Sequence, residues 1–490
     1  MLETTLTNSY GLLPAHFFSR IDPTQVASPR LIKFNAALAA ELNLDLGTDA
    51  DDLAAIFSGN RIIPGTRPIA MAYAGHQFGQ FVPQLGDGRA ILLGEARDRT
   101  GRRRDIQLKG SGRTPYSRSG DGRAALGPVL REYLVSEAMH ALGVPATRAL
   151  AAVTTGEVVF REARVPGAIL TRVAASHVRV GTFQFFAARG DVEATRALAD
   201  YVIDRHYADI ASAANPYLAL LRAVVRRQAS LVARWMHIGF IHGVMNTDNM
   251  AISGETIDFG PCAFMDSYDP MMVFSSIDHR GRYAYANQPT AAQWNLARFA
   301  ETLLPLIDPA LDRAIELATE AVGEFSTHFE DDWLAGMRRK LGMFLEEDGD
   351  DALIRQLLGL MHQNQADFTV TFRRLCAGAE SDAADVTVAG SFADAAAYGG
   401  WAQAWRARLA REPQPASERA AFMRLVNPAI IPRNHRIEQA IAAAVGREDF
   451  EPFEELGSAL ARPYEDVSSF AAYASPPSAE ERVLQTFCGT

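Results

Sequence analysis

The chain has 490 residues, of which 48% are hydrophobic and 22% charged, a balance that is typical of globular proteins and excludes a mostly disordered one. Its formal net charge of −10 argues against a protein that coats nucleic acid, because phosphate binding favours basic surfaces. No run of about 18 apolar residues occurs, so we expect no membrane span and no membrane partner.

The three cysteines, Cys262, Cys376 and Cys488, are far apart and lack metal-ligand spacing. This usage excludes a disulfide scaffold and favours a reducing compartment. The N-terminus carries Glu3 and lacks a basic segment before an apolar core, so we expect no signal peptide and a cytoplasmic location. The length predicts about three domain-sized units, or one two-lobed enzyme with an extension.

Residues 1–70 read as a loosely ordered lead-in that packs on the core, with one helix predicted at 30–43. From residue 74 the chain is punctuated by glycines. The run formed by Gly86, Asp87, Gly88 and Arg89 predicts a turn whose backbone amides can approach phosphate. Such a run is equally common in plain hairpin turns. A buried strand is expected next, at 90–95.

The strand 105–109 alternates, with its apolar residues on one face and Lys109 on the other. In a phosphotransferase of the kinase type, a strand lysine in this place reaches the nucleotide phosphates. A helix is predicted over 124–142, and Glu132 on it is the expected partner of Lys109. The alternatives are a solvated lysine and a solvated glutamate.

Two hairpin strands are predicted at 148–154 and 157–162, with their turn at Thr155-Gly156, and a third strand at 168–174. Together with the earlier strands and one helix, they predict a small antiparallel N-terminal lobe over 71–180. Arg172 and Arg179 flank the exit of the third strand.

Residues 181–290 are predicted to form a second lobe, and its helical stretch, 195–240, leads directly into the segment described next. Residues 291–490 are expected to form a helical extension with a mobile tail after 462. Its helices are predicted at about 291–304, 309–328, 330–345, 350–363, 367–376, 393–411, 416–424 and 436–446.

The segment from Ile241 to Asp266 reads IHGVMNTDNMAISGETIDFGPCAFMD. Kinases place a proton-accepting Asp two residues after a His, a metal-binding Asn seven residues after it, and a second metal ligand in Asp-Phe-Gly. Asn249 and Asp258 supply the Mg²⁺ pair, but Val244 occupies the place of the base. Asp248 is the remaining carboxylate of the loop and our candidate base. The alternative is an ordinary polar loop with a strand end.

Several long motifs in this chain resemble the SelO (YdiU) family. They are GHQFGQF at 75–81, QLGDGR at 84–89, LKGSGRTPYSRSGDGRA at 108–124, HGVMNTDNM at 242–250, IDFGPCAFMD at 257–266 and NPAIIPRNH at 427–435. The likeness runs from about residue 8 to the C-terminus. It implies an α+β, protein-kinase-like two-lobed fold and a protein adenylyltransferase, which moves AMP from ATP to Ser, Thr or Tyr hydroxyls on target proteins.

The resemblance also implies roles for single residues. Asn249 and Asp258 would hold Mg²⁺, with Mn²⁺ as an alternative, and Asp248 would accept the proton. Glu132 would hold Lys109. Contacts to ATP would come from Gly86, Gly88, Arg89, Lys109, Asp121, Gly122, Arg172 and Arg179. The family suggests a flipped nucleotide, with the β- and γ-phosphates among arginines and the α-phosphorus facing outward. We expect a monomer.

A redox switch is a further implication, because some family members carry selenocysteine near the C-terminus, where Cys488 stands here. A bond from Cys488 to Cys262 would tie the tail over the segment after Asp-Phe-Gly, and two unrelated thiols are the alternative. Two other functions remain open. One is a kinase-like phosphotransferase acting on a small molecule or a protein, and the other is an ATP-binding pseudokinase scaffold.

Overall fold

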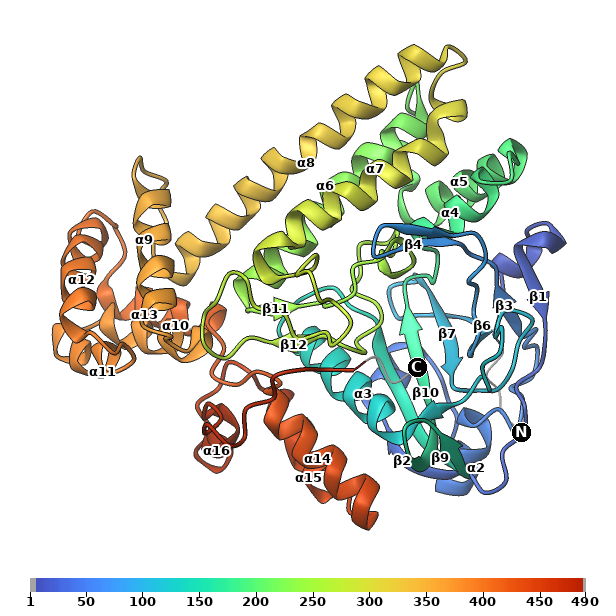
Figure 1. Cartoon of the computed structure of the whole chain (residues 1–490), viewed down its shortest axis with the longest axis horizontal. Helices are drawn as coiled ribbons and strands as arrows, with labels where there is room; N and C mark the ends of the chain where they lie inside the picture. The colour runs from blue at the N-terminus through green and yellow to red at the C-terminus, as the bar shows by residue number, and fades with distance from the viewer. Residues whose placement is uncertain (1–5, 488–490) are drawn as a thin grey trace.

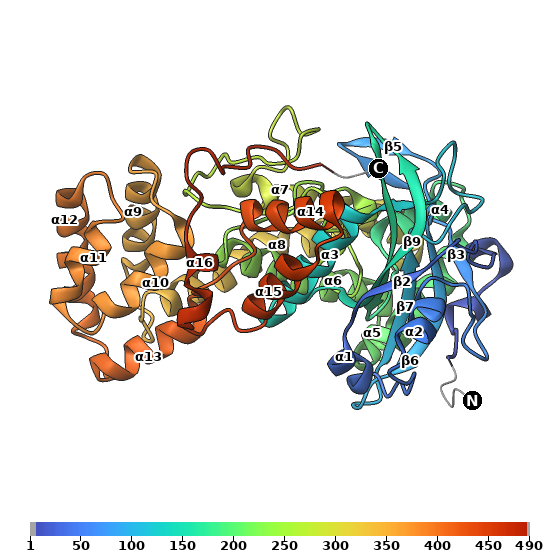
Figure 2. The same ribbon diagram turned by 90° about the horizontal axis from the view of Figure 1, so that it is seen from below.

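The computed structural model describes residues 6–487 and shows a mixed α+β protein (Figure 1). A sheet lies at one end of the molecule, and α9 to α13 lie at the opposite end in both views (Figures 1 and 2). The α+β class predicted from the sequence is confirmed. Between residues 6 and 487 no helix is both long and apolar enough to cross a membrane.

The main sheet is antiparallel, and its strand order is β1-β3-β6-β7-β10-β9-β2, with β8 paired to β10. Its strands are β1 (Phe18–Arg20), β2 (Arg30–Phe34), β3 (Ile69–Met71), β6 (Ala90–Arg97), β7 (Arg103–Lys109), β8 (Ala124–Ala125), β9 (Arg148–Phe160) and β10 (Arg164–Ala174). Two small hairpins lie outside it, formed by β4 (Gly75–Gln77) with β5 (Gln80–Val82), and by β11 (Phe240–Ile241) with β12 (Ala263–Phe264).

The lead-in contributes three strands to this sheet, so the helix predicted at 30–43 is wrong in its first half. Residues Arg30–Phe34 form β2 and pair with β9, and the helix α1 (Ala36–Glu41) begins only afterwards. Asn35 separates the two elements, because its side chain accepts a hydrogen bond from the backbone N–H of Leu38 and caps α1. A second helix, α2 (Ala50–Phe57), was not predicted.

The turn predicted at Thr155-Gly156 is also wrong. β9 runs without reversal from Arg148 to Phe160, and its register shifts opposite Pro166 and Ala168. Gly156 lies in this irregular stretch with φ +71°, and a Cβ there would meet Ser28 O at 2.8 Å. A glycine that looks like a hairpin turn in the sequence therefore forms a bulge, where another segment packs closely.

The helix α3 (Leu126–Ala141) confirms the prediction for 124–142 and packs between the sheet and two helices of the C-terminal part. These helices are α14 (Asn434–Arg447) and α15 (Glu451–Leu460), and they lie beside α3 in Figure 2. Because α3 is covered on both sides, its polar residues Arg131 and Glu132 are buried as well as its apolar ones.

The other helices form the remaining part of the chain. They are α4 (Val180–Ala187), α5 (Val192–His206), α6 (Pro216–His237), α7 (Gln288–Ile307), α8 (Leu311–Lys340), α9 (Asp350–Gln363), α10 (Phe368–Gly378), α11 (Asp385–Ala389), α12 (Ala395–Leu409), α13 (Ala416–Val426) and α16 (Ala471–Ala474). The two helices predicted at 309–328 and 330–345 are one helix, α8, because no proline or turn glycine interrupts the sequence between them.

After α15 the chain returns along the helices toward the sheet (Figures 1 and 2). Near its end, the backbone N–H of Thr486 donates to Phe274 O at 2.7 Å, and that of Ser276 donates to Thr486 O at 3.0 Å. The tail thus contacts the segment that follows Asp-Phe-Gly.

Candidate functional site

A cavity of about 990 Å³ opens where β6, β7 and β10 meet the loops at 116–123 and 244–258. We call it the large cavity. Eleven residues predicted from the sequence line it: Gly86, Gly88, Arg89, Lys109, Asp121, Gly122, Arg172, Arg179, Asp248, Asn249 and Asp258. The twelfth, Glu132, lies behind Lys109 and is 2% exposed.

Four charged side chains form one cluster at the inner end of the large cavity. Lys109 Nζ lies 2.6 Å from Glu132 Oε2 and 3.0 Å from Asp258 Oδ1. Arg172 Nε donates to the other oxygen of Glu132, and Arg172 Nη2 lies 3.4 Å from Asp258 Oδ1. The register explains the grouping, because Arg172 pairs with Gln107, whose side chain shares a face of β7 with that of Lys109.

Both carboxylates of this cluster are ionised. Burial alone would raise the pKa of Asp258, but Lys109, Arg172 and Arg89 hold it well below its usual range. Burial likewise opposes the charge of Glu132, and Arg172 and Lys109 together lower its pKa. Asp258 has φ +66°, an uncommon conformation for this residue type, which the surrounding ion pairs hold in place.

Asp248 lies in the 3₁₀ turn Thr247–Asn249 and is only 8% exposed. Gln77 Nε2 donates to its Oδ2 at 3.4 Å, and within residues 6–487 its Oδ1 has no hydrogen-bond partner. Burial raises the pKa of Asp248 to about 6, with Arg179 opposing the rise. A carboxylate with a pKa close to neutral is suited to accept a proton at physiological pH.

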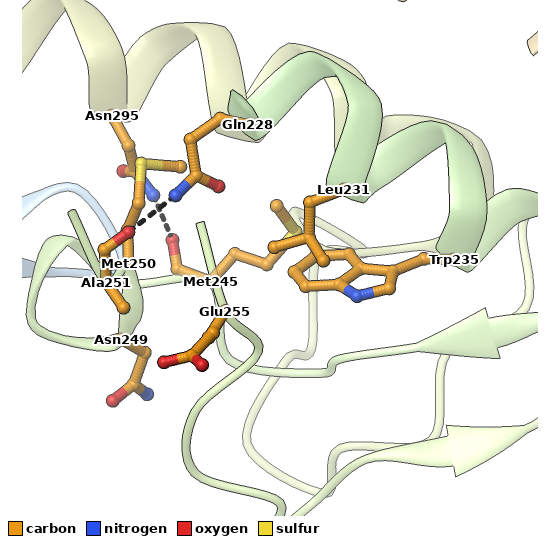
Figure 3. A pocket seen from close by; sticks show the side chains of 9 residues that line it. All are labelled: Gln228, Leu231, Trp235, Met245, Asn249, Met250, Ala251, Glu255 and Asn295. Carbon is orange, nitrogen blue, oxygen red and sulfur yellow. Dashed lines mark hydrogen bonds between the residues drawn. The ribbon is translucent and has the colours of Figure 1, made fainter. Parts of the chain in front are cut away.

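Hydrogen bonds from three side chains hold the backbone of the turn Thr247–Asn249 and of the residues that flank it. Arg179 Nη1 donates to the backbone oxygen of Asp248 at 3.2 Å. Figure 3 shows the rear, where Gln228 and Asn295 reach down from α6 and α7. Gln228 donates to Ala251 O at 2.7 Å, and Asn295 donates to Met245 O at 2.8 Å. These bonds fix the backbone on both sides of the turn.

Asn249 lies between the large cavity and a void of about 10 Å³ behind the turn, which has room for about one water molecule. Its Nδ2 donates to Val244 O at 3.0 Å, which leaves Oδ1 as its ligand atom. Asn249 Oδ1 and the ionised Asp258 suit Mg²⁺, which prefers one or two protein oxygens plus phosphate and water. Residues 6–487 hold no group of three or more His, Cys, Asp or Glu arranged for a metal.

Arg179 is positioned by residues that the sequence analysis missed. Its guanidinium lies 4.4 Å from the centre of the Tyr73 ring, and its Nη2 lies 3.9 Å from Asp87 Oδ1. Asp87 is buried and accepts hydrogen bonds from the backbone of Met71 at 3.1 Å and from Gln107 Nε2 at 3.3 Å. No pattern in the sequence points to Tyr73. Asp87 could have been found, because it lies between the predicted glycines Gly86 and Gly88.

The predicted glycines let backbone segments approach each other. A Cβ on Gly86, whose φ is +75°, would meet Tyr116 Cγ at 2.3 Å, and one on Gly88 would meet Tyr116 O at 2.9 Å. A Cβ on Gly122 would meet Gly112 O at 2.1 Å. The turn at 86–89 therefore packs on the loop that follows β7, and both line the large cavity.

Asp121 lies apart from the Lys109 cluster. It is 45% exposed at the mouth of the large cavity, where Arg161 Nη1 and Nη2 donate to its two oxygens at 2.9 and 3.2 Å.

Cys262 is a buried thiol in the segment after Asp-Phe-Gly. Burial raises the pKa of this thiol to about 12, and its S–H donates to Phe259 O. Cys488 lies outside the described residues, so its bond to Cys262 stays a prediction.

The chain is similar to proteins of known family over almost its whole length. A family model described as "Protein adenylyltransferase SelO" matches residues 1–461. "Protein nucleotidyltransferase YdiU" of Rhizobium meliloti (strain 1021) is 66% identical over 483 residues, which are 99% of this chain and 99% of the relative. The protein of the same name from Bradyrhizobium diazoefficiens is 62% identical over 484 residues, which are 99% and 98% of the two chains.

Proposed function

The chain belongs to the SelO family of protein adenylyltransferases, and from this premise we propose that it transfers AMP from ATP to Ser, Thr or Tyr hydroxyls of target proteins. The relatives' names make it a nucleotidyltransferase that acts on protein. The finer proposal has three parts: a protein-kinase-like two-lobed fold, a flipped nucleotide, and Mg²⁺ or Mn²⁺ bound by Asn249 and Asp258.

The arrangement of cations in the large cavity carries this proposal. Lys109 and Arg172 lie at the inner end, and Arg89 and Arg179 also line the walls. A nucleotide placed as in a kinase would present its γ-phosphate to the acceptor and would not need these arginines. If the β- and γ-phosphates lie among them instead, the α-phosphorus is left facing the mouth.

Asp248 provides the proton acceptor in this scheme. Its carboxylate takes the proton of the acceptor hydroxyl as the hydroxyl oxygen bonds to the α-phosphorus. The bond from that phosphorus to the α,β-bridging oxygen breaks, and pyrophosphate leaves with the electron pair. Val244, where a kinase has its base, is buried and cannot accept a proton.

Developing charge on the pyrophosphate is offset by fixed groups. Lys109, Arg172 and Arg179 are held by ion pairs and hydrogen bonds before the reaction begins, so little reorganisation is needed. Mg²⁺, when bound, neutralises phosphate charge. Asp258 would thus have two roles, since it would hold the metal and it orients Lys109 through their ion pair.

Radiolabelled ATP tests this function. ATP labelled on the α-phosphate should label protein substrates, and mass spectrometry should find an added AMP on Ser, Thr or Tyr. Label transferred only from the γ-phosphate would show a kinase-like phosphotransferase instead. ATP binding without any transfer would show a pseudokinase scaffold.

Two variants connect the activity to the cavity. Asp258→Ala should abolish transfer, because it removes a metal ligand and a partner of Lys109. Asp269→Ala, which lies just after the segment Ile241–Asp266 and outside the cavity lining, is the matched control and should keep activity. Full transfer by the Asp258 variant would refute the site.

A further inference from the structure

A second pocket, of about 400 Å³, lies between α6, α8 and α13, beside the end of α3 and Tyr464. We call it the α6–α8 pocket. It shares no lining residue with the large cavity. The two long helices that form it run side by side in Figure 1. Part of its wall is apolar, from Leu142, Val144 and Val426.

The wall of the α6–α8 pocket carries positive charge that the described residues do not neutralise. Arg234, Arg339 and Lys340 line it, and none of the three has a carboxylate within ion-pair distance in residues 6–487. Asp332, the acidic residue of the lining, is already bonded to Arg226 at 2.7 and 3.0 Å. Arg234 donates to the backbone oxygen of Gly143 at 3.0 Å, but this bond does not neutralise its charge. Cations without a carboxylate partner in a recess of a chain with net charge −10 favour an anionic ligand.

Lys340 is the most buried of these cations, with 3% of its surface exposed. Its Nζ lies 4.3 Å from the centre of the Phe372 ring and 5.5 Å from that of Phe368. Within residues 6–487 its Nζ donates no hydrogen bond to an oxygen, and the Lys340 backbone oxygen accepts one from Asn427 Nδ2 at 2.8 Å. The aromatic rings offset only part of the cost of burying an ammonium group.

The titratable groups around Lys340 do not supply a negative partner. Cys376 faces it from α10, His237 from α6, and Arg339 precedes it on α8. Burial lowers the pKa of the Lys340 amine to about 7, with Cys376 opposing the shift. Burial also lowers the pKa of His237 to about 4, so His237 is neutral and adds no charge.

A lysine, unlike an arginine, can gain and lose a proton at the buried position 340. The chain has only three lysines, Lys33, Lys109 and Lys340, among its 48 Lys and Arg residues. An arginine at this buried position would be permanently charged, whereas a lysine can lose its proton when no anion is present. Lys33 is paired with Glu454, and Lys109 with Glu132.

We propose that the α6–α8 pocket binds a small molecule that carries a phosphate group on an apolar body, and that Lys340 takes up a proton from solvent when this ligand binds. Arg234 and Arg339 would attract the phosphate, and the apolar wall would cover the rest of the molecule. The site is separate from the proposed transfer of AMP and does not depend on it.

Pyridoxal 5′-phosphate is a suitable probe, because it carries a phosphate, an apolar ring and an aldehyde. The neutral Lys340 amine and the aldehyde form an imine and release water, and borohydride then reduces the imine to a stable secondary amine. Mass spectrometry of tryptic peptides reads Lys33, Lys109 and Lys340 separately. We expect labelling at Lys340 that inorganic phosphate suppresses and that equal concentrations of acetate suppress less.

Variants separate this proposal from a purely structural lysine. Exchange of both arginines for Gln should lower labelling of Lys340 by roughly fivefold or more, since two charge-assisted contacts are lost. In calorimetry with inorganic phosphate, the wild type should take up protons at pH 8, and Lys340→Arg should bind without uptake. Lys33→Arg is the matched control and should change neither readout.

Labelling of Lys33 with none at Lys340 would overturn the proposal, as would labelling of Lys340 that phosphate does not reduce. Circular dichroism of each variant checks that it folds. If Lys340→Arg does not fold, the exchanges of Arg234 and Arg339 still decide the outcome, because both residues are exposed and their replacement leaves the core intact.

Discussion

The cluster at the inner end of the large cavity predicts an unusual response to loss of one carboxylate. Glu132→Gln keeps the shape of the side chain but leaves Lys109 and Arg172 with Asp258 as their shared partner. Breaking a buried ion pair by removing one partner costs about 3–5 kcal/mol. Because Gln still accepts a hydrogen bond, we expect the lower end, about 3 kcal/mol of unfolding free energy.

ATP with Mg²⁺ should recover part of this loss. The triphosphate brings negative charge to the two cations, so it should raise the unfolding midpoint of Glu132→Gln more than that of the wild type. Urea denaturation followed by tryptophan fluorescence, with and without nucleotide, measures both effects. Glu454→Gln is the control, since its pair with Lys33 is partly exposed and worth under about 1 kcal/mol.

Two results would refute this reasoning. One is a stability of Glu132→Gln no lower than that of the control. The other is an equal effect of ATP on variant and wild type, which would mean that the triphosphate does not contact these cations.

Three further predictions follow from the site and its support. Asp248→Asn should slow transfer by about 10²–10⁴-fold, because the proton acceptor is lost. Burial raises the folded-state pKa of this carboxyl to about 6, so the free energy of unfolding of the wild type falls as pH rises through 6. In thermal melts the variant should therefore be more stable than the wild type at pH 8 but not at pH 4. Gly75→Ala should lower kcat with little change in KM for ATP, because its Cβ would meet Asp248 Oδ1 at 2.8 Å; unchanged kcat would show that the base tolerates displacement. Arg205→Met should destabilise the fold by about 3–5 kcal/mol, since it removes the cation that pairs with the buried carboxylates of Glu95 and Asp105 at 2.6 and 2.5 Å. Burial raises the pKa of Asp105 and Arg205 lowers it, so without Arg205 this carboxyl should protonate more easily, and the deficit should shrink as pH falls; a pH-independent deficit would contradict this cause.

The large cavity and the α6–α8 pocket differ in how their charged side chains are paired. The large cavity contains paired charges whose partners are all supplied by the protein, so it is ordered before a ligand arrives. The α6–α8 pocket contains three cations that form no ion pair with a carboxylate of residues 6–487. The first arrangement suits catalysis, which needs fixed groups, and the second suits a ligand that completes the charge balance.

The sequence by itself determined the elements whose signal is local. Alternation predicted the Lys109 strand, apolar periodicity predicted α3 and most later helices, and the motif spacing grouped Asn249, Asp258 and Asp248, which line a single cavity. The pairing of Lys109 with Glu132 was also predicted and is present. Apart from the Lys109–Glu132 pair, which joins β7 to α3 and was expected from the kinase arrangement, the deciding contacts lie within one element or follow from a motif whose spacing fixes them.

Only the tertiary structure decided the partners of Arg179 and which of the predicted turns are present. Gly156 lies in a bulge because Ser28, far away in sequence, packs against it, and the first half of the predicted helix at 30–43 is a strand because β9 offers it an edge. Asp87 and Tyr73 hold Arg179 through contacts that no local pattern encodes. Burial and charge pairing depend on the segments that meet across the folded chain, and the neighbours of a residue along the sequence do not specify them.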